Sequence, residues 1–301
     1  MKVIMYHYIR PNSSQYPFFN NLTIEQFKSQ LDYFEKNYNF ISKQDFIEII
    51  NNKKKINKSI VLTFDDGLKD HIKYVLPELN KRNLWGIFYI PTKIFFYKKL
   101  LNVHRIHFLK GKYGSELILK KTLSIINKDM LDKVFFKKFN NKIYTSKKYN
   151  DSEKKLRQLF NYQLSYNHVD NILDSLCNDL IDEKKLHKNT YLNLNDLKKI
   201  HKSRSIIGVH THAHRVLSRL NYNEQNKEIN FSLDFLKKKI KIKKPYFFAY
   251  PYGYNASFDK NTIKSLKKNK FHNAVKFDNR DQYTVKNKYQ ISRLDCNKFI
   301  F

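Results

Sequence analysis

The chain has 301 residues and a mass of 36.5 kDa, enough for one large α/β domain or two ordinary ones. Hydrophobic residues make up 41% of the chain and aromatic residues 15%, a content that excludes intrinsic disorder despite a formal net charge of +31. Most of that charge comes from lysines scattered among many asparagines, so we interpret it as compositional bias and do not expect nucleic acid as a partner.

The first part of the chain alternates between strand-like and helix-like segments. Residues 2–9 form the first predicted strand, and residues 22–37 follow as a helix with Thr23 as its N-cap. A second, shorter helix is predicted over residues 42–52. The run 60–64 (Ile-Val-Leu-Thr-Phe) has the β-branched and aromatic make-up of a strand buried on both faces. This pattern predicts parallel strands joined by crossover helices.

Two adjacent carboxylates, Asp65 and Asp66, end that buried strand and are followed at once by Gly67. Residues 69–83 then have helical periodicity, and residues 85–91 indicate another buried strand. The two acids therefore lie where the chain leaves the predicted core, which is a location typical of functional sites in α/β folds.

Residues 98–191 interrupt this alternation, since they carry helical periodicity and almost no strand signal. We interpret them as a helical insertion within a single domain that spans residues 1–301, and we expect the insertion to form a lid or a substrate-contacting subdomain. The histidines inside it, His104, His107 and His168, have no partner at metal-binding spacing and are expected at a surface or interface.

Strand-like segments resume after the insertion. The predicted strands cover residues 205–210, 244–253, 271–278 and 289–295, and the predicted helices cover residues 221–240 and 257–271. Several of these strands end in polar or glycine-containing clusters. That arrangement is typical of an α/β barrel whose chemistry gathers at the carboxyl ends of its strands.

Three of the strand ends carry residues suited to metal-assisted hydrolysis. His210 and His214 are four residues apart, so both imidazoles can hold one ion if the chain turns helical after the strand. Either Asp65 or Asp66 would complete a set of two histidines and one carboxylate with open positions, as a catalytic metal requires. The other acid can then remove a proton from water during attack on a carbonyl. A backbone N–H in the turn 251–253 can stabilise the oxyanion.

Each of these motifs is weak by itself. An Asp-Asp-Gly sequence after a strand is often only a turn or a helix cap, and a pair of histidines four residues apart occurs by chance on surface helices. Their occurrence together at successive strand ends favours a metal hydrolase.

These residues resemble the motifs of the polysaccharide deacetylase family, also called carbohydrate esterase family 4, which includes chitooligosaccharide deacetylases. The sequence "TFDDG" resembles the first family motif, "HTHAH" the second and "FAYPYG" the third, and "MYHYI" and "AVKFDN" are similar in position and character. The resemblance covers the residues before about 97 and after about 192. It implies a distorted, incomplete (β/α) barrel and leaves the helical insertion outside.

The resemblance also implies a role for each motif residue. Asp65 would be the general base, and Asp66, His210 and His214 would hold a divalent metal ion. Zinc is the common ion in the family, and iron, cobalt or nickel suit the same ligands. The backbone N–H of Tyr252 would join the metal in stabilising the oxyanion.

Two positions depart from the family pattern. Ala249 stands where many members have an arginine that orients the catalytic base. The late segment "ISRLDCNKF" lacks the histidine that serves many members as general acid. His272 lies at the start of a predicted strand, which is the wrong end for a barrel site, so the general acid has no assignment from the sequence.

Cysteine content and hydropathy bear on the compartment. Cys177 and Cys296 are too few for a disulfide framework. Tyr6, His7 and Tyr8 interrupt the N-terminal apolar segment, and no stretch approaches the roughly 20 apolar residues of a membrane span. We therefore expect a cytoplasmic protein, with peripheral contact at the inner membrane face as an option that the positive charge allows.

The leading hypothesis is a metal-dependent hydrolase that removes an N-acetyl or N-formyl group from an amino sugar in a polysaccharide, oligosaccharide or glycan precursor. The expected location favours a nucleotide- or lipid-linked precursor of a cell-surface glycan, and the positive charge would suit its phosphates. The first alternative is a catalytically decayed carbohydrate-binding protein on the same fold, favoured by the unassigned acid. The second is a nucleic-acid-binding module, motivated only by net charge.

Overall fold

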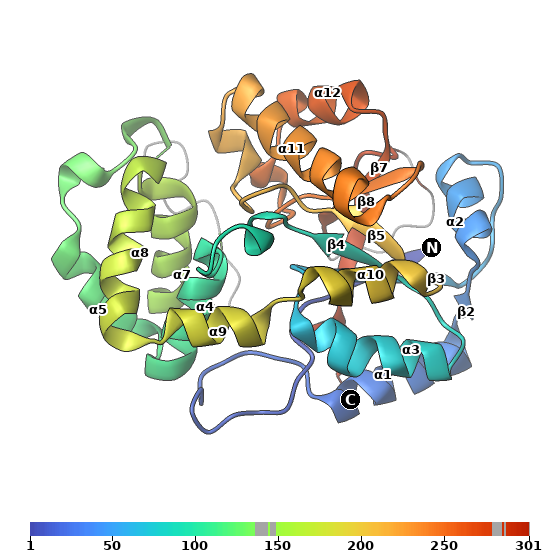
Figure 1. Cartoon of the computed structure of the whole chain (residues 1–301), viewed down its shortest axis with the longest axis horizontal. Helices are drawn as coiled ribbons and strands as arrows, with labels where there is room; N and C mark the ends of the chain where they lie inside the picture. Colours follow the sequence, from blue (N-terminus) through green and yellow to red (C-terminus); the bar gives the residue numbers. More distant parts are fainter. Residues whose placement is uncertain (136–143, 145–148, 279–284, 286, 301) are drawn as a thin grey trace. The chain divides into compact units, whose positions relative to one another are not determined.

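The computed structural model describes residues 1–135, 144, 149–278, 285 and 287–300, and it divides the chain into two compact units (Figure 1). Unit 1 comprises Met1–Pro11, Asn21–Phe96 and Asn189–Phe301. Unit 2 comprises Asn12–Asn20 and Tyr97–Lys188. Unit 2 thus contains most of the predicted helical insertion, residues 98–191, together with a short stretch near the N-terminus.

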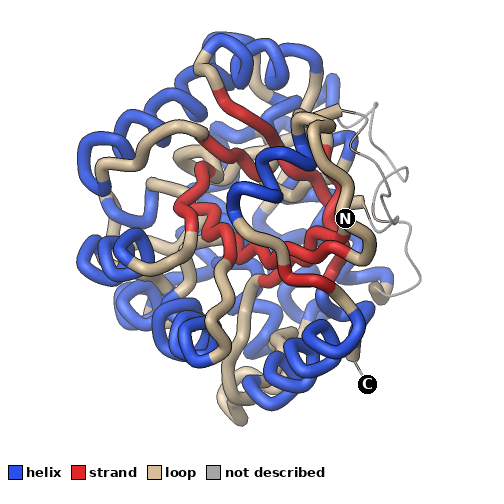
Figure 2. The backbone as a smooth tube through the Cα atoms, turned by 90° about the vertical axis from the view of Figure 1, so that its right-hand side faces the viewer, coloured by secondary structure: helices blue, strands red, loops and turns tan. Residues whose placement is uncertain are grey.

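A closed ring of parallel strands forms the centre of unit 1 (Figure 2). The order is β1-β8-β7-β6-β5-β4-β3, and β1 pairs with β3 to close the ring. The strands are β1 Lys2–Tyr6, β3 Ser59–Asp65, β4 Gly86–Ile90, β5 Ile206–Val209, β6 Tyr246–Ala249, β7 Phe271–Phe277 and β8 Ile291–Asp295, and the short β2 Asn39–Phe40 pairs with β3. Because seven described strands replace the eight of a complete barrel, the predicted incomplete (β/α) barrel is confirmed.

Helices of unit 1 lie between these strands in the sequence. They are α1 Ile24–Asn37, α2 Lys43–Ile50, α3 Leu76–Lys81, α10 Leu194–Lys202, α11 Tyr222–Ile240 and α12 Lys260–Lys268. The N-cap predicted at Thr23 is confirmed, since its side chain accepts from the N–H of Gln26 and the Gln26 side chain returns the bond. The helix predicted over residues 69–83 is shorter, because a π-helical turn (His71–Val75) precedes α3 and Pro77 lies in the first turn of that helix.

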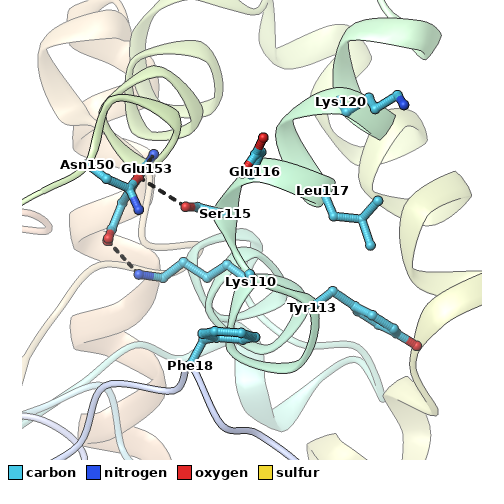
Figure 3. A pocket seen from close by; sticks show the side chains of 10 residues that line it. Phe18, Lys110, Tyr113, Ser115, Glu116, Leu117, Lys120, Asn150 and Glu153 are labelled. Carbon is cyan, nitrogen blue, oxygen red and sulfur yellow. Dashed lines mark hydrogen bonds and ion pairs between the residues drawn. The ribbon is translucent and has the colours of Figure 1, made fainter.

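Unit 2 is helical among its described residues and has a hydrophobic core of its own. Its helices are α4 Asn102–Tyr113, α5 Ser115–Ile125, α7 Asp151–Gln158 and α8 Tyr166–Leu180, and α9 Glu183–Thr190 runs to the boundary with unit 1. A pocket of about 630 Å³ lies on this unit, lined by Phe18 and by residues of and beside α4, α5 and α7 (Figure 3). None of the residues predicted for catalysis lines it.

Among the described residues, no helix combines the length and the apolar character that crossing a membrane requires.

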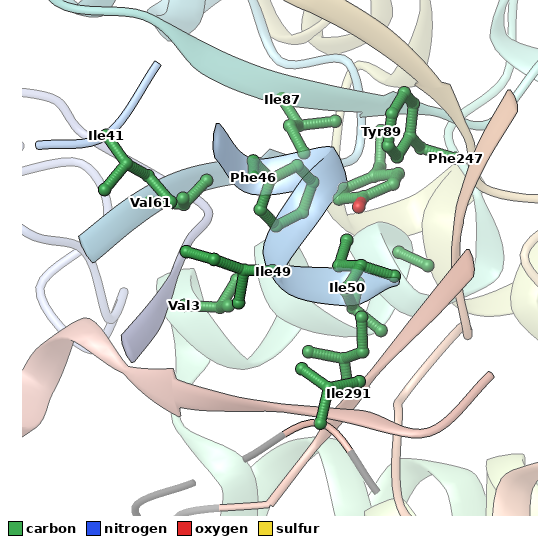
Figure 4. Close-up of a cluster of buried hydrophobic side chains, with 13 residues drawn as sticks. Val3, Ile41, Phe46, Ile49, Ile50, Val61, Ile87, Tyr89, Phe247 and Ile291 are labelled. Carbon is green, nitrogen blue, oxygen red and sulfur yellow. The ribbon is translucent and has the colours of Figure 1, made fainter. Parts of the chain in front are cut away.

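The core of unit 1 fills the end of the barrel where the strands begin (Figure 4). Phe46, Ile49 and Ile50 of α2 pack there in one cluster with buried side chains of several strands, such as Val61 and Phe247. Each of these side chains stabilises the fold by roughly 1.5–3 kcal/mol when fully buried. Because apolar residues close this end, the carboxyl ends of the strands are left for polar groups.

Candidate active site

Residues from three strand ends meet at the carboxyl end of the barrel. Asp65 is the last residue of β3 and Asp66 follows it, while His210 comes directly after β5. His214 and Tyr252 lie beside each other, with ring centroids 5.0 Å apart. The structure therefore brings all five sequence-predicted site residues to the same end of the barrel.

The backbone is strained at several of these positions. Asp66, Thr211, His214 and Tyr252 all have positive φ angles, between 55° and 78°, in the left-handed region that side chains other than glycine disfavour. Such residues cost about 1–3 kcal/mol each and persist where the surrounding structure fixes them, often at functional sites. The chain after β5 turns at Thr211 and is not helical there. The prediction that a helix after the strand would bring His210 and His214 together is therefore wrong. The left-handed turn brings them together instead.

Asp66, His210 and His214 form a buried set of potential metal ligands. Oδ1 of Asp66 lies 3.5 Å from Nε2 of His210 and 3.4 Å from Nε2 of His214. Nitrogen and oxygen donors about 2.1 Å from one ion at tetrahedral angles would lie roughly 3.4 Å apart, so the three donors fit one divalent ion. One potential ligand atom from each residue lies within 4.8 Å of the others.

The tautomer of His210 agrees with metal binding. Its Nδ1 lies 2.7 Å from the carbonyl oxygen of Ala249, which can only accept, so Nδ1 carries the proton and Nε2 offers its lone pair toward Asp66. Burial lowers the pKa of His210 below its usual value, although Asp65 and Asp66 act in the opposite direction. The neutral imidazole that a metal requires is thus the favoured form.

A buried arginine on the last strand, β8, binds Asp65 at the end of β3. Arg293 of β8 donates from Nη1 to Oδ1 of Asp65 and from Nη2 to Oδ2, both at 2.7 Å, and both residues are 1% exposed. Burial, the largest influence, raises the pKa of Asp65, but Arg293, His210 and His7 together bring it below its ordinary value. Asp65 is therefore an ionised carboxylate in a fixed orientation.

Sequence reasoning missed Arg293. The resemblance implies an arginine at the position of Ala249, whereas in this chain Arg293 of β8 bonds Asp65. A signal was present, because Arg293 stands two residues after Ile291, a core residue, and side chains alternate along a strand. An arginine on the inward face of a buried strand indicates a buried anionic partner.

His7 also lies at the site and was not assigned a role from the sequence. Its Nε2 is 3.9 Å from Oδ2 of Asp65 and 3.9 Å from Oδ2 of Asp66, and its side chain is 38% exposed. The pairing of β1 with β3 over five residues sets this position. His7 is thus an imidazole at the solvent side of the two acids.

Glu228 of α11 supports the loop between His210 and His214. Its Oε2 accepts from the backbone N–H groups of His212 and Ala213, at 3.0 and 2.7 Å. The ring of His212 points to a different partner, with Nδ1 3.0 Å from the hydroxyl of Thr92. His212 therefore contributes to the loop, and it is not among the potential ligands Asp66, His210 and His214.

His272 lies at the other end of the barrel, as expected from its place in β7. Its ring is 6.0 Å from that of Phe247, which belongs to the core at the beginning of the strands. His272 is therefore excluded from the site chemistry.

Comparison with family models gives one match, to the model described as polysaccharide deacetylase, over residues 180–274. That range contains His210, His214 and Tyr252, whereas Asp65 and Asp66 lie before it. No curated protein matches the sequence.

Solved structures of deacetylases share the fold. The Streptococcus pyogenes deacetylase PplD in complex with acetate aligns with a TM-score of 0.59 and 15% identity over 98% of this chain and 91% of its own. IcaB from Ammonifex degensii aligns with a TM-score of 0.58 and 15% identity over 97% of this chain and 90% of its own. The BpsB deacetylase domain from Bordetella bronchiseptica aligns with a TM-score of 0.56 and 13% identity over 98% of this chain and 94% of its own. The resemblance to polysaccharide deacetylases drawn from the sequence is thus confirmed.

Proposed function

We propose that this chain is a metal-dependent hydrolase that removes an N-acetyl or N-formyl group from an amino sugar of a saccharide. The observation that supports this most strongly is a buried carboxylate, Asp65, held ionised by Arg293 next to the ligand set of Asp66, His210 and His214. The polysaccharide deacetylase match and the shared barrel support the same reaction class.

Asp66, His210 and His214 would hold the metal ion, and zinc, iron, cobalt or nickel suit two imidazoles and a carboxylate. When bound, the ion would polarise the amide carbonyl and make a water molecule more acidic. The remaining chemistry belongs to the side chains around it.

Asp65 acts as the general base in this proposal. It accepts a proton from the water whose oxygen forms the new bond to the carbonyl carbon. Arg293 keeps the carboxylate ionised and restricts its rotation, because it bonds both oxygens. The backbone N–H of Tyr252 would donate to the developing oxyanion, and the contact of its ring with His214 fixes the turn that presents it.

His7 is the proposed proton donor to the leaving amine. The late segment offers no histidine, whereas His7 places Nε2 3.9 Å from a carboxylate oxygen of Asp65 and keeps one side open to solvent. As the C–N bond breaks, the nitrogen takes a proton from His7 and the acyl group leaves as acetate or formate. This assignment fills the role that the sequence left open.

We expect an N-acetylated saccharide as substrate, and the net charge of +31 favours one that carries phosphate, such as a nucleotide- or lipid-linked precursor. The test is acetate release from a panel of N-acetylated saccharides, nucleotide sugars and lipid-linked saccharides, before and after chelation and with metal added back. Metal-dependent release from at least one class supports the proposal. Bound metal without release from any of them would favour the decayed binding protein.

A further inference from the structure

We propose that Asp70 and His71 are positioning residues that hold His7 over the two active-site acids. They follow Asp66 in the same segment, so one stretch of chain supplies a metal ligand and fixes the proton donor. The inference rests on the proposed function, because His7 acts there as the proton donor.

His71 holds the backbone of His7 directly. Its side chain is fully buried, and its Nε2 lies 3.1 Å from the carbonyl oxygen of His7. A carbonyl oxygen only accepts, so Nε2 carries the proton and donates it. The ring of His71 meets Phe64 and Phe88 edge-on, at centroid distances of 5.6 and 5.7 Å, and this packing restricts its rotation. Burial also lowers the pKa of His71 to about 4, which keeps the ring neutral.

Asp70 holds the residues that follow His7. Its Oδ2 accepts from the backbone N–H of Ile9 at 3.2 Å and from Nε of Arg10 at 2.7 Å, and the Asp70 residue is 6% exposed. The Arg10 guanidinium lies 4.7 Å from the ring centroid of Tyr8. Two consecutive residues thus fix the carbonyl of His7 and the residues that follow it.

A purely structural role explains these contacts less well. The strand β1 ends at Tyr6 and already pairs with β3 in a register of five residues and with β8. Asp70 and His71 bond the residues immediately beyond the strand, where Leu22 bridges Ile9 but no described strand pairs with His7 itself. Fixing this segment sets the position of the His7 ring relative to Asp65 and Asp66.

Substrates that differ in their leaving group separate positioning of a proton donor from general support. An amide needs its nitrogen protonated as it leaves, whereas 4-nitrophenyl acetate releases a stable phenolate without help. We expect His7→Ala and His71→Phe to lower kcat on an N-acetylated amino sugar by ~100-fold while kcat on 4-nitrophenyl acetate falls by less than ~5-fold. His71→Gln, which keeps an N–H donor, should restore the amide rate to within ~5-fold of wild type.

The matched control is His104→Phe, the same exchange at a fully buried histidine of unit 2, and it should leave the ratio of the two rates unchanged. Equal losses of kcat on the amide and the ester in His71→Phe would overturn the inference. An unchanged kcat on the amide in His71→Phe, together with loss of amide hydrolysis in His7→Ala, would also overturn it.

A second measurement keeps the inference separate from the proposed function. The imidazole NMR resonances of His7 in the metal-loaded protein should shift or broaden in His71→Phe and remain in place in His71→Gln. This result with a wild type that releases no acetate would contradict the proposed function and still support positioning. Unchanged His7 resonances in His71→Phe would refute positioning whatever the activity.

Discussion

The pairing of Arg293 with Asp65 can be tested by replacing the arginine with methionine. In Arg293→Met, Asp65, which is 1% exposed in the wild type, loses the cation that bonds both of its oxygens. Breaking a buried ion pair by removing one partner costs about 3–5 kcal/mol, because the other charge stays buried. We therefore expect the free energy of unfolding to fall by about 3–5 kcal/mol. Loss of the guanidinium also removes a main influence that lowers the pKa of Asp65, so hydrolysis at neutral pH should fall sharply.

A double variant distinguishes this charge effect from simple loss of packing. Asp65→Asn leaves Arg293 buried without its anion and should destabilise by a similar amount, whereas Arg293→Met with Asp65→Asn leaves neither charge. The double variant should therefore be more stable than the sum of the single losses predicts, by about 2–3 kcal/mol. It should remain inactive, since the base is gone.

Urea unfolding followed by tryptophan fluorescence provides the assay. Trp85 is the one tryptophan of the chain, and its Nε1 donates to the carbonyl oxygen of Ile41 at 2.7 Å beside the core of unit 1. Its emission therefore reports on the unit that contains the site. Strictly additive losses in the two single variants and the double variant would refute the reasoning.

Three further predictions concern the surroundings of the site. Glu228→Leu removes the acceptor for two backbone N–H groups between the histidine ligands and should weaken metal binding by about 10–100-fold, measured by competition with a chelator. The pKa of His71 falls from 6.5 to about 4 on folding. Its contribution of about 3 kcal/mol to the free energy of unfolding is therefore complete above pH 6.5 and is lost as the pH falls toward 4. His71→Phe should flatten the curve of unfolding free energy against pH in that range. Arg105→Met removes a buried guanidinium that pairs with the partly exposed carboxylates of Asp174 and Glu183 in unit 2, so it should destabilise that unit while metal affinity, measured by calorimetry, changes by less than about 3-fold.

The barrel could be predicted because its determinants are local. Strands buried on both faces are continuous apolar runs, as in residues 60–64, and the helix start at Thr23 carries both halves of a capping box. The helix over residues 69–83 was predicted too long, because periodicity does not distinguish a π-helical turn from an α-helix, and Pro77 marks only the start of the regular part.

The contacts that complete the site depend on closure of the ring. Arg293 meets Asp65 because β8 pairs with β1 and β1 with β3, which joins residues more than two hundred positions apart. His7 lies near Asp65 and Asp66 because β1 pairs with β3. The approach of His214 to His210 requires a left-handed turn at Thr211, a conformation that a β-branched residue rarely adopts and that no propensity indicates.

The central claim is that Asp65 acts as the general base while the adjacent Asp66 binds the metal ion. One measurement tests this claim most directly. Metal content and acetate release from an N-acetylated saccharide are measured together for the wild type, Asp65→Asn and His210→Ala. The account predicts that both variants lose acetate release, that Asp65→Asn keeps its metal and that His210→Ala loses it. Loss of metal in Asp65→Asn, or acetate release that survives in either variant, would contradict the account.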